Sequence, residues 1–555
     1  MSIFSDILVR KPGRSLFNLS HDRKFSCDWA KLYPILCMET VPGDTIKVST
    51  EFLIRMAPLR SPVMHRINVK VHYFFVPNRL LWDKWEDFIT GIDQKKAYME
   101  ADNSNGYFVN PVPPFVTVRG LTEVNSSILQ DGSLADFLGF PTHRPGERVT
   151  TSGVKVPLLP FAAYTKIYDD WYRNQNVEAP ILANHPLNSG ENNYVNLLEM
   201  RFKMWEKDYF TSALPFAQRG DPVDIPVRLG ELRLKNDQTK PTYVRPTDAS
   251  VDFTTSNPIS VGGEQSSQPY QAYVDDGRDE DKVNIDITGH TTVDGASGSL
   301  VGTINDLRLA TRIQRWLEKN ARVGGRYIEQ ILAHFGIHSS DARLQRAEYL
   351  GGFTAPIVIS DIEQNSASTW QSPDGVYEST PQGTLAGKGT TLSKTPAYKC
   401  FCEEHGFLIG IMSITPRTTY QDQLSKMWQR ENRYDYYFPE FAHLGEQEVN
   451  KAEVFFDVTD SDQQSKDRFG FQERYCEYKY IPSSVHGEFK GNLHFWHLGR
   501  QFNSQPVLNK DFVQAQPNTD IFAVEDANLV DHFYVNLINH VSAMRPMPKQ
   551  AIPTL

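Results

Sequence analysis

Two neighbouring stretches near the N-terminus alternate between apolar and polar side chains, as a β-strand with one buried face does. The first stretch runs from Thr45 to Met56 and follows the turn signal Pro42-Gly43. The second runs from Ile67 to Val76 and stops at Pro77, which lacks the N–H that a ladder hydrogen bond needs. The apolar face of the first stretch consists of Ile46, Val48, Phe52, Ile54 and Met56. These two stretches predict an antiparallel sheet.

The C-terminal third has the same character. Strand-like runs separated by Pro, Gly, Asn and Asp span residues 397–414, 453–458, 470–481 and 533–542. Strand-rich segments at both ends, with irregular chain between them, favour a sandwich whose sheets are completed by distant parts of the sequence. No repeat of about 20 to 50 residues is evident, which argues against a propeller or a solenoid.

Composition places the chain among ordinary globular proteins. Hydrophobic residues make up 40% of its 555 residues and charged residues 22%. The 12% of aromatic residues, with 34 Pro and 35 Gly, favours strands, turns and long ordered loops over disorder. We therefore expect one main β domain with long excursions.

Charge and cysteine content limit the classes of function. The net charge of -10 repels phosphate, so a nucleic-acid contact needs a local basic patch or a separate basic partner. The five cysteines, without a CxxC pair, suggest neither a disulfide scaffold nor a zinc ribbon; they are Cys27, Cys37, Cys400, Cys402 and Cys476. No signal peptide or membrane-spanning run is visible, which predicts a protein that stays in the cytoplasm of the cell that makes it and has no membrane partner.

One amphipathic helix is predicted from about Ile304 to Asn320. Its apolar side consists of Leu309, Ala310, Ile313, Trp316 and Leu317. Its opposite side is basic, with Arg308, Arg312, Arg315 and Lys319, and Arg322 extends this basic stripe. Three explanations remain open for the stripe: a solvated or salt-bridged face, a contact with DNA phosphate, or a contact with an acidic neighbouring subunit. A second helix is predicted over Arg326 to Phe335, ending at Gly336.

Residues 235–299 differ from the rest of the chain because Thr, Ser, Asp, Gly and Pro dominate them. We expect a variable, exposed insertion there, between a first part of the core at 1–234 and a helical segment with the remaining core at 300–555. The insertion carries an acidic loop that contains Asp275, Asp276, Asp279, Glu280 and Asp281. A further long loop is expected over Ser366 to Ser393.

Motifs for catalysis or metal binding are missing or incomplete. The stretch from Gly383 to Thr390 resembles a phosphate-binding loop but is one residue short, and a flexible surface loop explains it better. His334 and His338 lack the glutamate and the unbroken helix of a zinc motif, and His494 and His497 lie in a strand-like context. Adjacent carboxylates such as Asp169-Asp170 are expected to be solvated surface charge. We expect no catalytic residue, no metal site, no cofactor and no enzymatic activity.

One aromatic-rich segment in a loop-like context is Tyr434-Asp435-Tyr436-Tyr437-Phe438-Pro439. Tyr434, Tyr436, Tyr437 and Phe438 are candidate anchors of a contact between subunits. Filling the core of their own subunit is an equally good explanation at this point.

Several blocks of sequence resemble the major capsid protein of gokushoviruses, which belong to the Microviridae. These blocks are Phe17 to His21, Met56 to Leu59, Pro62 to Arg66, Phe74 to Arg79, Trp85 to Ile89, Ala321 to Tyr327 and Asp341 to Gly352. The resemblance as a whole covers about half of the residues and spans nearly all of the length, and these strings are long and specific. Residues 235–299 match nothing that the resemblance covers, as expected for the variable insertion of this family.

The resemblance implies a mainly β fold, an eight-stranded antiparallel jelly roll with long loop insertions and a few short helices. It implies a bacteriophage virion protein, assembled in the host bacterial cytoplasm into a T=1 icosahedral shell of sixty copies around circular single-stranded DNA. Implied partners are a small basic packaging protein, an internal scaffolding protein, a DNA pilot protein and a receptor on the host cell surface. Host attachment is implied for the exposed insertion.

Two other functions compete with a capsid subunit. A carbohydrate-binding or hydrolytic β-sandwich would be a small species with a concave groove for its ligand. A DNA-binding protein without sequence preference is disfavoured by the net charge of -10, although the basic helix would suit such a role. Formation of closed particles would separate the capsid subunit from both.

Overall fold

A computed structural model describes residues 13–90, 111–118, 128–144, 153–218, 304–323, 345–365, 368–371, 377–380, 382–456, 458, 467–524 and 530–550, with six short strands between 233 and 294. The chain divides into two compact units. The first consists of Met1–Arg219 and Asn320–Leu555, and the second is Gly220–Lys319.

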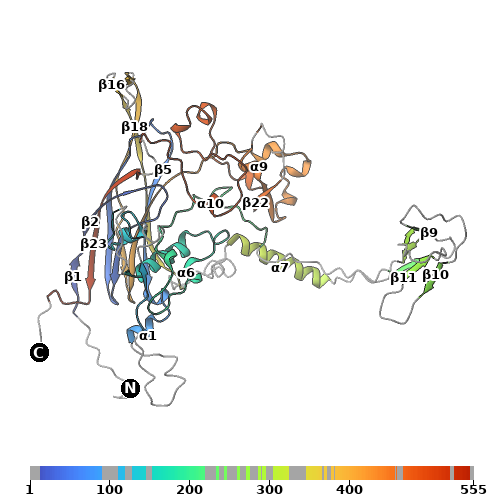
Figure 1. Cartoon of the computed structure of the whole chain (residues 1–555), viewed down its shortest axis with the longest axis horizontal. Helices are drawn as coiled ribbons and strands as arrows, with labels where there is room; N and C mark the ends of the chain where they lie inside the picture. The colour runs from blue at the N-terminus through green and yellow to red at the C-terminus, as the bar shows by residue number, and fades with distance from the viewer. Residues whose placement is uncertain are drawn as a thin grey trace, which may run out of the picture. The chain divides into compact units, whose positions relative to one another are not determined.

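The larger sheet of the first unit has seven described strands, and all of its pairings are antiparallel. Its order is β1 (Ser15–Asn18), β23 (Phe533–Arg545), β4 (Thr45–Met56), β18 (Leu385–Lys394) and β15 (Val358–Glu363). Off this path, β2 (His21–Cys27) pairs with β23, and β19 (Tyr398–Phe401) pairs with β4. Strands from both ends of the chain therefore lie side by side at the centre of this sheet (Figure 1).

The second sheet has four described strands, also antiparallel. Its order is β14 (Glu348–Pro356), β5 (Ile67–Pro77), β20 (Gly406–Pro416) and β3 (Tyr33–Thr40). Every residue of β20 is buried, so both faces of this sheet are covered. A central strand covered on both sides is apolar along its whole length and does not alternate.

The main hydrophobic core lies between the two sheets. It joins the inward side chains of β4 and β23 in one sheet with those of β5, β20 and β3 in the other. Members of this core include Ile46, Val48, Phe52, Val71, Tyr73, Leu408, Met412, Val535 and Leu537. Burial of apolar side chains on facing sheets is what defines a β-sandwich.

Helices cover the outer face of the second sheet. Apolar residues of this face pack with α5 in a second core, and they include Phe74, Val76, Phe407 and Ile409. The elements on this side are η1 (Asn78–Leu80), α1 (Trp85–Thr90), β6 (Phe115–Val118), α4 (Leu134–Leu138), β7 (Val154–Pro157), α5 (Leu159–Ile167), the π-helical turn η2 (Tyr168–Tyr172), α6 (Ile181–Asn184) and η3 (Val195–Leu198).

A third, smaller core organises the loop-rich region beside the sandwich. Phe210, Tyr420, Val449, Phe469 and Phe512 are among its buried residues. The elements of this region are η4 (Lys426–Gln429), η5 (Arg433–Asp435), η6 (Pro439–Phe441), β21 (Glu446–Asn450), α9 (Lys451–Val454), β22 (Arg468–Glu473), η8 (Cys476–Tyr478), η9 (Gly487–Lys490), η10 (His494–Trp496) and α10 (Lys510–Val513).

In the second unit, six short strands form three antiparallel pairs that are nested in sequence. The outer pair is β8 (Arg233–Asn236) with β13 (Thr291–Asp294), the middle pair β9 (Tyr243–Pro246) with β12 (Ile285–Thr288), and the inner pair β10 (Ile259–Gly262) with β11 (Gln271–Val274). The helix α7 (Ile304–Val323) begins in this unit and crosses its boundary.

The strongest sequence predictions are confirmed. The strand over Thr45 to Met56 has the predicted bounds, and the predicted strand at Ile67 includes Pro77. The run at 397–414 contains β19 and most of β20, the run at 533–542 lies within β23, and the helix from Ile304 extends to Val323. A mainly β, antiparallel fold is also confirmed.

Other predictions were wrong. The run at 453–458 does not begin as a strand, because Glu453 ends a capping box with Asn450 that starts the short helix α9. The run at 470–481 ends its strand at Glu473 and turns into η8. The loop predicted over Ser366 to Ser393 contains β16 (Ser368–Gln371), β17 (Tyr377–Thr380) and most of β18. The helix predicted over Arg326 to Phe335 lies outside the described residues.

Candidate functional site

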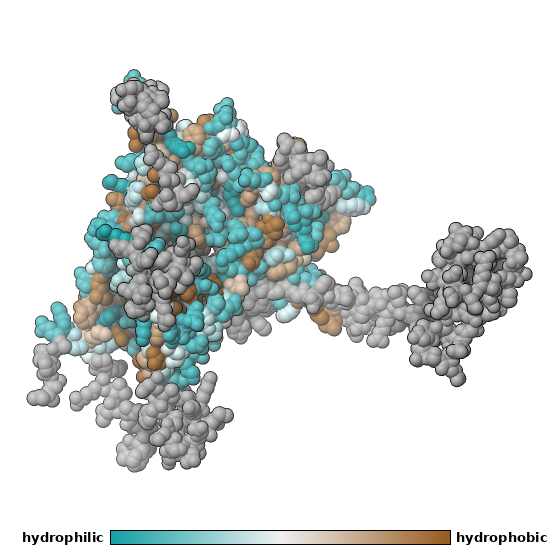
Figure 2. Space-filling view, in the orientation of Figure 1, coloured by the Kyte–Doolittle hydropathy of each residue, from teal (hydrophilic) through white to brown (hydrophobic). Residues whose placement is uncertain are grey.

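The aromatic segment that the sequence singled out lies on the surface of the first unit, between η5 and η6. The side chains of Tyr434, Tyr436, Tyr437 and Phe438 are 53%, 52%, 51% and 43% exposed. These fractions decide against the explanation that the four rings fill the core of their own subunit. Figure 2 shows apolar residues on the visible surface of the region that contains β22 and α9 in Figure 1.

Hydrogen bonds fix the backbone of this segment. Asp435 accepts the backbone N–H groups of Glu431 (2.9 Å) and Asn432 (2.8 Å) through one carboxylate oxygen. The hydroxyl of Tyr475 donates to the carbonyl of Tyr436 (3.2 Å). The backbone N–H of Tyr437 donates to the hydroxyl of Tyr478 at 3.2 Å. The exposed rings therefore stand on a backbone that is already ordered.

Arginine side chains lie over these rings. The Arg430 guanidinium is 5.0 Å from the ring centroid of Tyr436 and 4.6 Å from that of Tyr478. Arg433 lies 4.8 Å from the ring centroid of Tyr434. Tyrosine and arginine are the residue types enriched at the energetic centres of protein interfaces. We call Arg430, Tyr434, Tyr436, Tyr437, Phe438 and Tyr478 the aromatic patch.

The basic stripe of α7 is exposed over its described side chains. Arg308, Arg312, Arg315, Lys319 and Arg322 all reach solvent. Arg322 belongs to the first unit, where its Nε donates to a carboxylate oxygen of Glu446, whose side chain is only 2% exposed. The other four belong to the second unit. The ion pair with Glu446 therefore explains the presence of a basic side chain at Arg322. The roles of the other four basic residues stay predictions.

Three side chains on the apolar side of α7 are exposed. Leu309 is 59% exposed, Ile313 38% and Trp316 54%, whereas Ala310 is buried. The acidic loop residues Asp275, Asp276, Asp279, Glu280 and Asp281 lie outside the described residues, as do His334 and His338.

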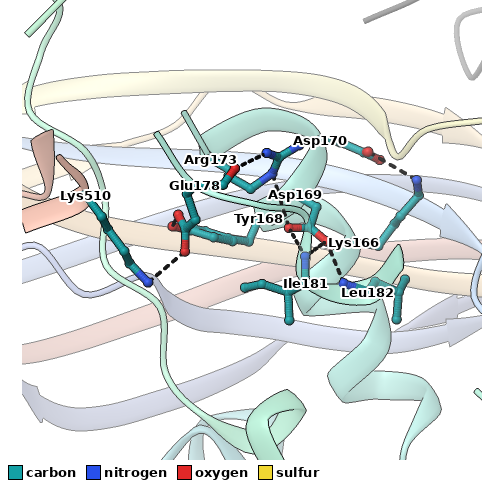
Figure 3. A network of polar contacts seen from close by, with 9 residues as sticks. All are labelled: Lys166, Tyr168, Asp169, Asp170, Arg173, Glu178, Ile181, Leu182 and Lys510. Atoms are coloured by element: carbon teal, nitrogen blue, oxygen red, sulfur yellow. Dashed lines mark hydrogen bonds and ion pairs between the residues drawn. The ribbon is translucent and has the colours of Figure 1, made fainter. Parts of the chain in front are cut away.

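A cavity of about 720 Å³ lies beside α5 and α6 and is lined in part by Lys166, Asp169, Asp170, Arg173 and Arg346. Four of these charged side chains form ion pairs with one another. Lys166 pairs with Asp170 (3.1 Å), and Arg173 pairs with Asp169 (3.5 Å), as Figure 3 shows. Asp170 also accepts the backbone N–H of Ala347 at 2.9 Å.

Asp169 is the centre of the network in Figure 3 and is only 7% exposed. It accepts the backbone N–H groups of Ile181 (2.9 Å) and Leu182 (2.8 Å) at the start of α6. Burial raises the pKa of this carboxyl, and these N–H groups oppose the shift. The prediction that Asp169-Asp170 is solvated surface charge was wrong, because π-helical geometry turns Asp169 inward.

The remaining sequence motifs have structural explanations. His494 lies in η10 and not in a strand, and Nε2 of His497 contacts the carbonyl oxygen of Phe489 at 2.7 Å. The stretch from Gly383 to Thr390 enters strand β18 and forms no phosphate-binding loop. Within the described residues, no group of three or more His, Cys, Asp or Glu is placed to hold a metal ion. Over the same residues, no helix is long and apolar enough to cross a membrane.

Comparisons with known proteins agree with this geometry. Residues 5–555 match the family described as "Capsid protein (F protein)". The chain is 33% identical to "Capsid protein VP1" of Chlamydia phage 1, over 100% of this chain and 97% of that protein. It is 33% identical to the protein of the same name from Bdellovibrio phage phiMH2K, over 93% and 90% of the two chains. Its identity to that of Spiroplasma virus 4 is 28%, over 98% and 95%. The chain therefore belongs to the Capsid protein (F protein) family, as a capsid protein of the gokushovirus type.

Proposed function

We propose that this capsid protein assembles, sixty copies at a time, into a T=1 icosahedral shell around circular single-stranded DNA. The observation that supports this most directly is the aromatic patch, in which exposed tyrosine and arginine side chains stand on an ordered backbone. Such pre-ordering lowers the entropic cost of binding a neighbour. The protein is a structural subunit of the virion and not an enzyme.

The sandwich supports the proposal of a jelly roll. Two antiparallel sheets enclose one core, and their central strands come from distant parts of the chain. We propose that eight of the eleven described strands of the two sheets form the jelly roll and that the other three, β1 among them, and the short pairs are additions to it. Long connections between strands, such as the region with η4, η5 and η6, then supply the surfaces that meet between subunits.

The experiment is assembly of the chain expressed in bacteria, with and without its internal scaffolding protein, followed by negative-stain electron microscopy. Closed particles of uniform size are expected. The double variant Tyr436→Ser, Tyr437→Ser is expected to stay folded and to assemble at least about tenfold less, since truncated interface anchors each cost roughly 2 kcal/mol or more.

Tyr534 provides the matched control, because it is 47% exposed on β23 and lies outside the aromatic patch. The variant Tyr534→Ser should assemble like the parent chain. Unassembled chains under both expression conditions would overturn the shell proposal, and normal assembly of the double variant would remove the patch from the subunit contact.

The insertion is proposed to attach the virion to the host cell-surface receptor. The nested pairing of its strands supports this proposal, because it brings the two ends of the insertion together as β8 and β13. Asn236 and Thr291 form the last pair of that ladder, so residues 237–290 are replaceable by a two-residue Asn-Gly turn. The shortened chain should still form shells but lose adsorption to cells, and a chain that no longer folds would contradict the proposal.

The basic stripe is proposed to contact the packaged DNA through Arg308, Arg312, Arg315 and Lys319. A small basic packaging protein would neutralise much of the remaining phosphate charge, because this chain is acidic overall. An internal scaffolding protein and a DNA pilot protein complete the proposed partners. Replacing Arg308, Arg312 and Arg315 by Gln should lower the DNA content of the particles, whereas unchanged content would favour a solvated face.

A further inference from the structure

Two described ladders between Val358 and Thr390 share one register and together make up a long β-hairpin. Val358 pairs with Thr390 and Glu363 with Leu385 in the β15–β18 ladder. The β16–β17 ladder, in which Ser368 pairs with Thr380, continues in the same register. Between the two ladders, the backbone N–H of Gln364 donates to the carbonyl oxygen of Thr384 (3.1 Å). We call this hairpin the arm, and at about 3.3 Å per residue it is roughly 46 Å long from Val358 to Gln371.

The base of the arm is fixed to the sandwich. Strand β18 pairs with β4 from Thr390 to Lys394. A Cβ atom on Gly387 would lie 2.4 Å from the carbonyl oxygen of Ser61, and one on Gly389 would lie 2.2 Å from Sδ of Met56. The two glycines therefore permit a backbone approach that a larger residue would block. They explain the glycine-rich motif that resembles a phosphate loop.

The outer part of the arm joins no larger sheet in the part of the chain that the structure describes. Among the described strands, β16 and β17 pair only with each other, and the far edge of β15 pairs with no strand. Figure 1 shows β16 beyond the ends of the neighbouring strands. An isolated two-stranded hairpin is marginally stable in water, so an arm of this length gains stability from an external surface.

One face of the arm is apolar and basic. Val358, Ile362 and Leu392 lie on this face and are 65%, 47% and 70% exposed. Lys388 lies among them, because its pairing partner Ser360 alternates with Val358 and Ile362. The carboxylates of β15, Asp361 and Glu363, point to the opposite face, since side chains alternate along a strand. The arm face thus combines exposed apolar side chains with positive charge.

We propose that the arm is a subunit clasp: the apolar face of β15 and β18, together with the unpaired edge of β15, docks on a second copy of this chain. This inference rests on the proposed shell assembly and names the element that makes one of its contacts. A chain with a net charge of -10 offers acidic surface to Lys388, and an unpaired strand edge offers backbone groups to a neighbour.

A protein surface fits this face better than DNA does. Phosphate would engage Lys388 but would leave Val358, Ile362 and Leu392 in water, whereas a second copy buries them. Edge strands that must avoid partners usually carry lysine, proline or a bulge. Strand β15 has no lysine, no proline and an unshifted register against β18, and its two charged residues, Asp361 and Glu363, lie on the face opposite to the apolar one.

The first test is the double variant Val358→Asp, Ile362→Asp in the full chain. Its matched control is Val507→Asp, because Val507 is 59% exposed and lies outside both the arm and the aromatic patch. The double variant should keep the thermal unfolding midpoint of the parent and form at least about tenfold fewer shells, while the control forms them normally. Equal shell yields in parent, control and double variant would overturn the clasp.

A second variant removes the outer arm without disturbing its base. Residues 366–382 are replaced by Asn-Gly, which closes the β15–β18 ladder just beyond the bond between Gln364 and Thr384. The shortened chain should again form fewer shells than the parent chain. If the parent chain forms no shells, the proposed assembly itself fails; if the parent and the shortened chain assemble equally, the outer arm has no part in the clasp.

Hydrogen exchange keeps the test decisive if a variant misfolds. In the parent protein, amides of residues 358–363 should exchange at least about tenfold more slowly in DNA-free shells than in unassembled chains. Equal exchange in both would overturn the clasp. Protection found only in shells that contain DNA would overturn it in favour of a nucleic-acid contact.

Discussion

The hydroxyl of Tyr73 on β5 donates a hydrogen bond of 2.5 Å to Oγ1 of Thr50 on β4, across the core between the two sheets. Thr50 Oγ1 in turn donates to Oδ1 of Asn539 on β23 (2.7 Å), and Asn539 donates to the carbonyl of Ile35 on β3 (2.9 Å). Both Thr50 and Asn539 are fully buried. One polar chain therefore links four strands of both sheets inside an apolar core.

Replacing Thr50 by Val should destabilise the folded chain by about 1 to 3 kcal/mol. The change keeps the shape of the side chain but leaves the buried Oδ1 of Asn539 without its donor. Chemical denaturation of the unassembled chain measures the loss. The same substitution at the exposed Thr354 of β14 is the control, and equal effects at both positions would contradict the role of the network.

Asp169→Asn should also destabilise the chain, by about 2 to 4 kcal/mol. Both carboxylate oxygens of Asp169 face donors, whereas the amide has one acceptor oxygen, so its NH2 group would face either Arg173 or the N–H groups of Ile181 and Leu182 and leave a buried donor without an acceptor. Denaturant titration reports the change. Asp511→Asn, at the exposed start of α10, is a suitable comparison, and a loss no larger than at this position would refute the prediction.

Lys203 should make stability depend on pH. Its ammonium donates to Ser413 (3.1 Å), and burial lowers its pKa from 10.5 to about 7. Between these values the unfolded chain binds more protons at this group than the folded chain does, so its contribution to stability rises as pH increases from about 7 to 10.5. Below about pH 7 Lys203 is protonated in both the folded and the unfolded chain, so the folded chain carries the full desolvation penalty of the buried ammonium.

The variant Lys203→Met removes that titration. Denaturation midpoints of parent and variant, measured from pH 7 to 10, should converge as pH rises, with the variant more stable at the lower end. Parallel curves over this range would show that the ammonium is solvated in the folded protein.

Gly387→Ala should cost about 1 to 3 kcal/mol, because the added Cβ meets backbone of the Ser61 segment and cannot be relieved by a rotamer change. Gly13→Ala, where a Cβ would have no atom within 4 Å, should be nearly neutral. Thermal unfolding of both variants measures the difference. A neutral Gly387→Ala would mean that β18 tolerates a shift at the base of the arm.

The sequence by itself determined the elements whose periodicity is strong and uninterrupted. Alternation from Thr45 to Met56 predicts a strand with the observed bounds, and the period of the α7 segment predicts a helix from Ile304. Local patterns suffice there because one buried face imposes one spacing on the apolar residues. The blocks that resemble gokushovirus capsid proteins likewise identified the family before any geometry was known.

Local patterns fail where a distant contact decides the conformation. Glu453 stands in an apolar run that suggests a strand, but its reciprocal cap with Asn450 starts a helix. Gly387 and Gly389 look like loop residues, yet they allow β18 to lie against Ser61 and Met56, which are far away in sequence. In the sequence Asp169 resembles a surface charge. In the structure its carboxylate accepts hydrogen bonds from two backbone N–H groups at the start of α6.

Exposure was decided by the tertiary structure alone. The segment from Tyr434 to Phe438 carries four rings that a core could bury, but the third core is built from other residues, such as Tyr420 and Phe469, and the four rings lie at the surface. The same holds for Val358 and Ile362, whose solvent-facing side follows from the pairing of β15 at the edge of the larger sheet. A sequence specifies which side chains are apolar. Contacts between segments that are far apart in sequence decide which of these side chains a single chain buries.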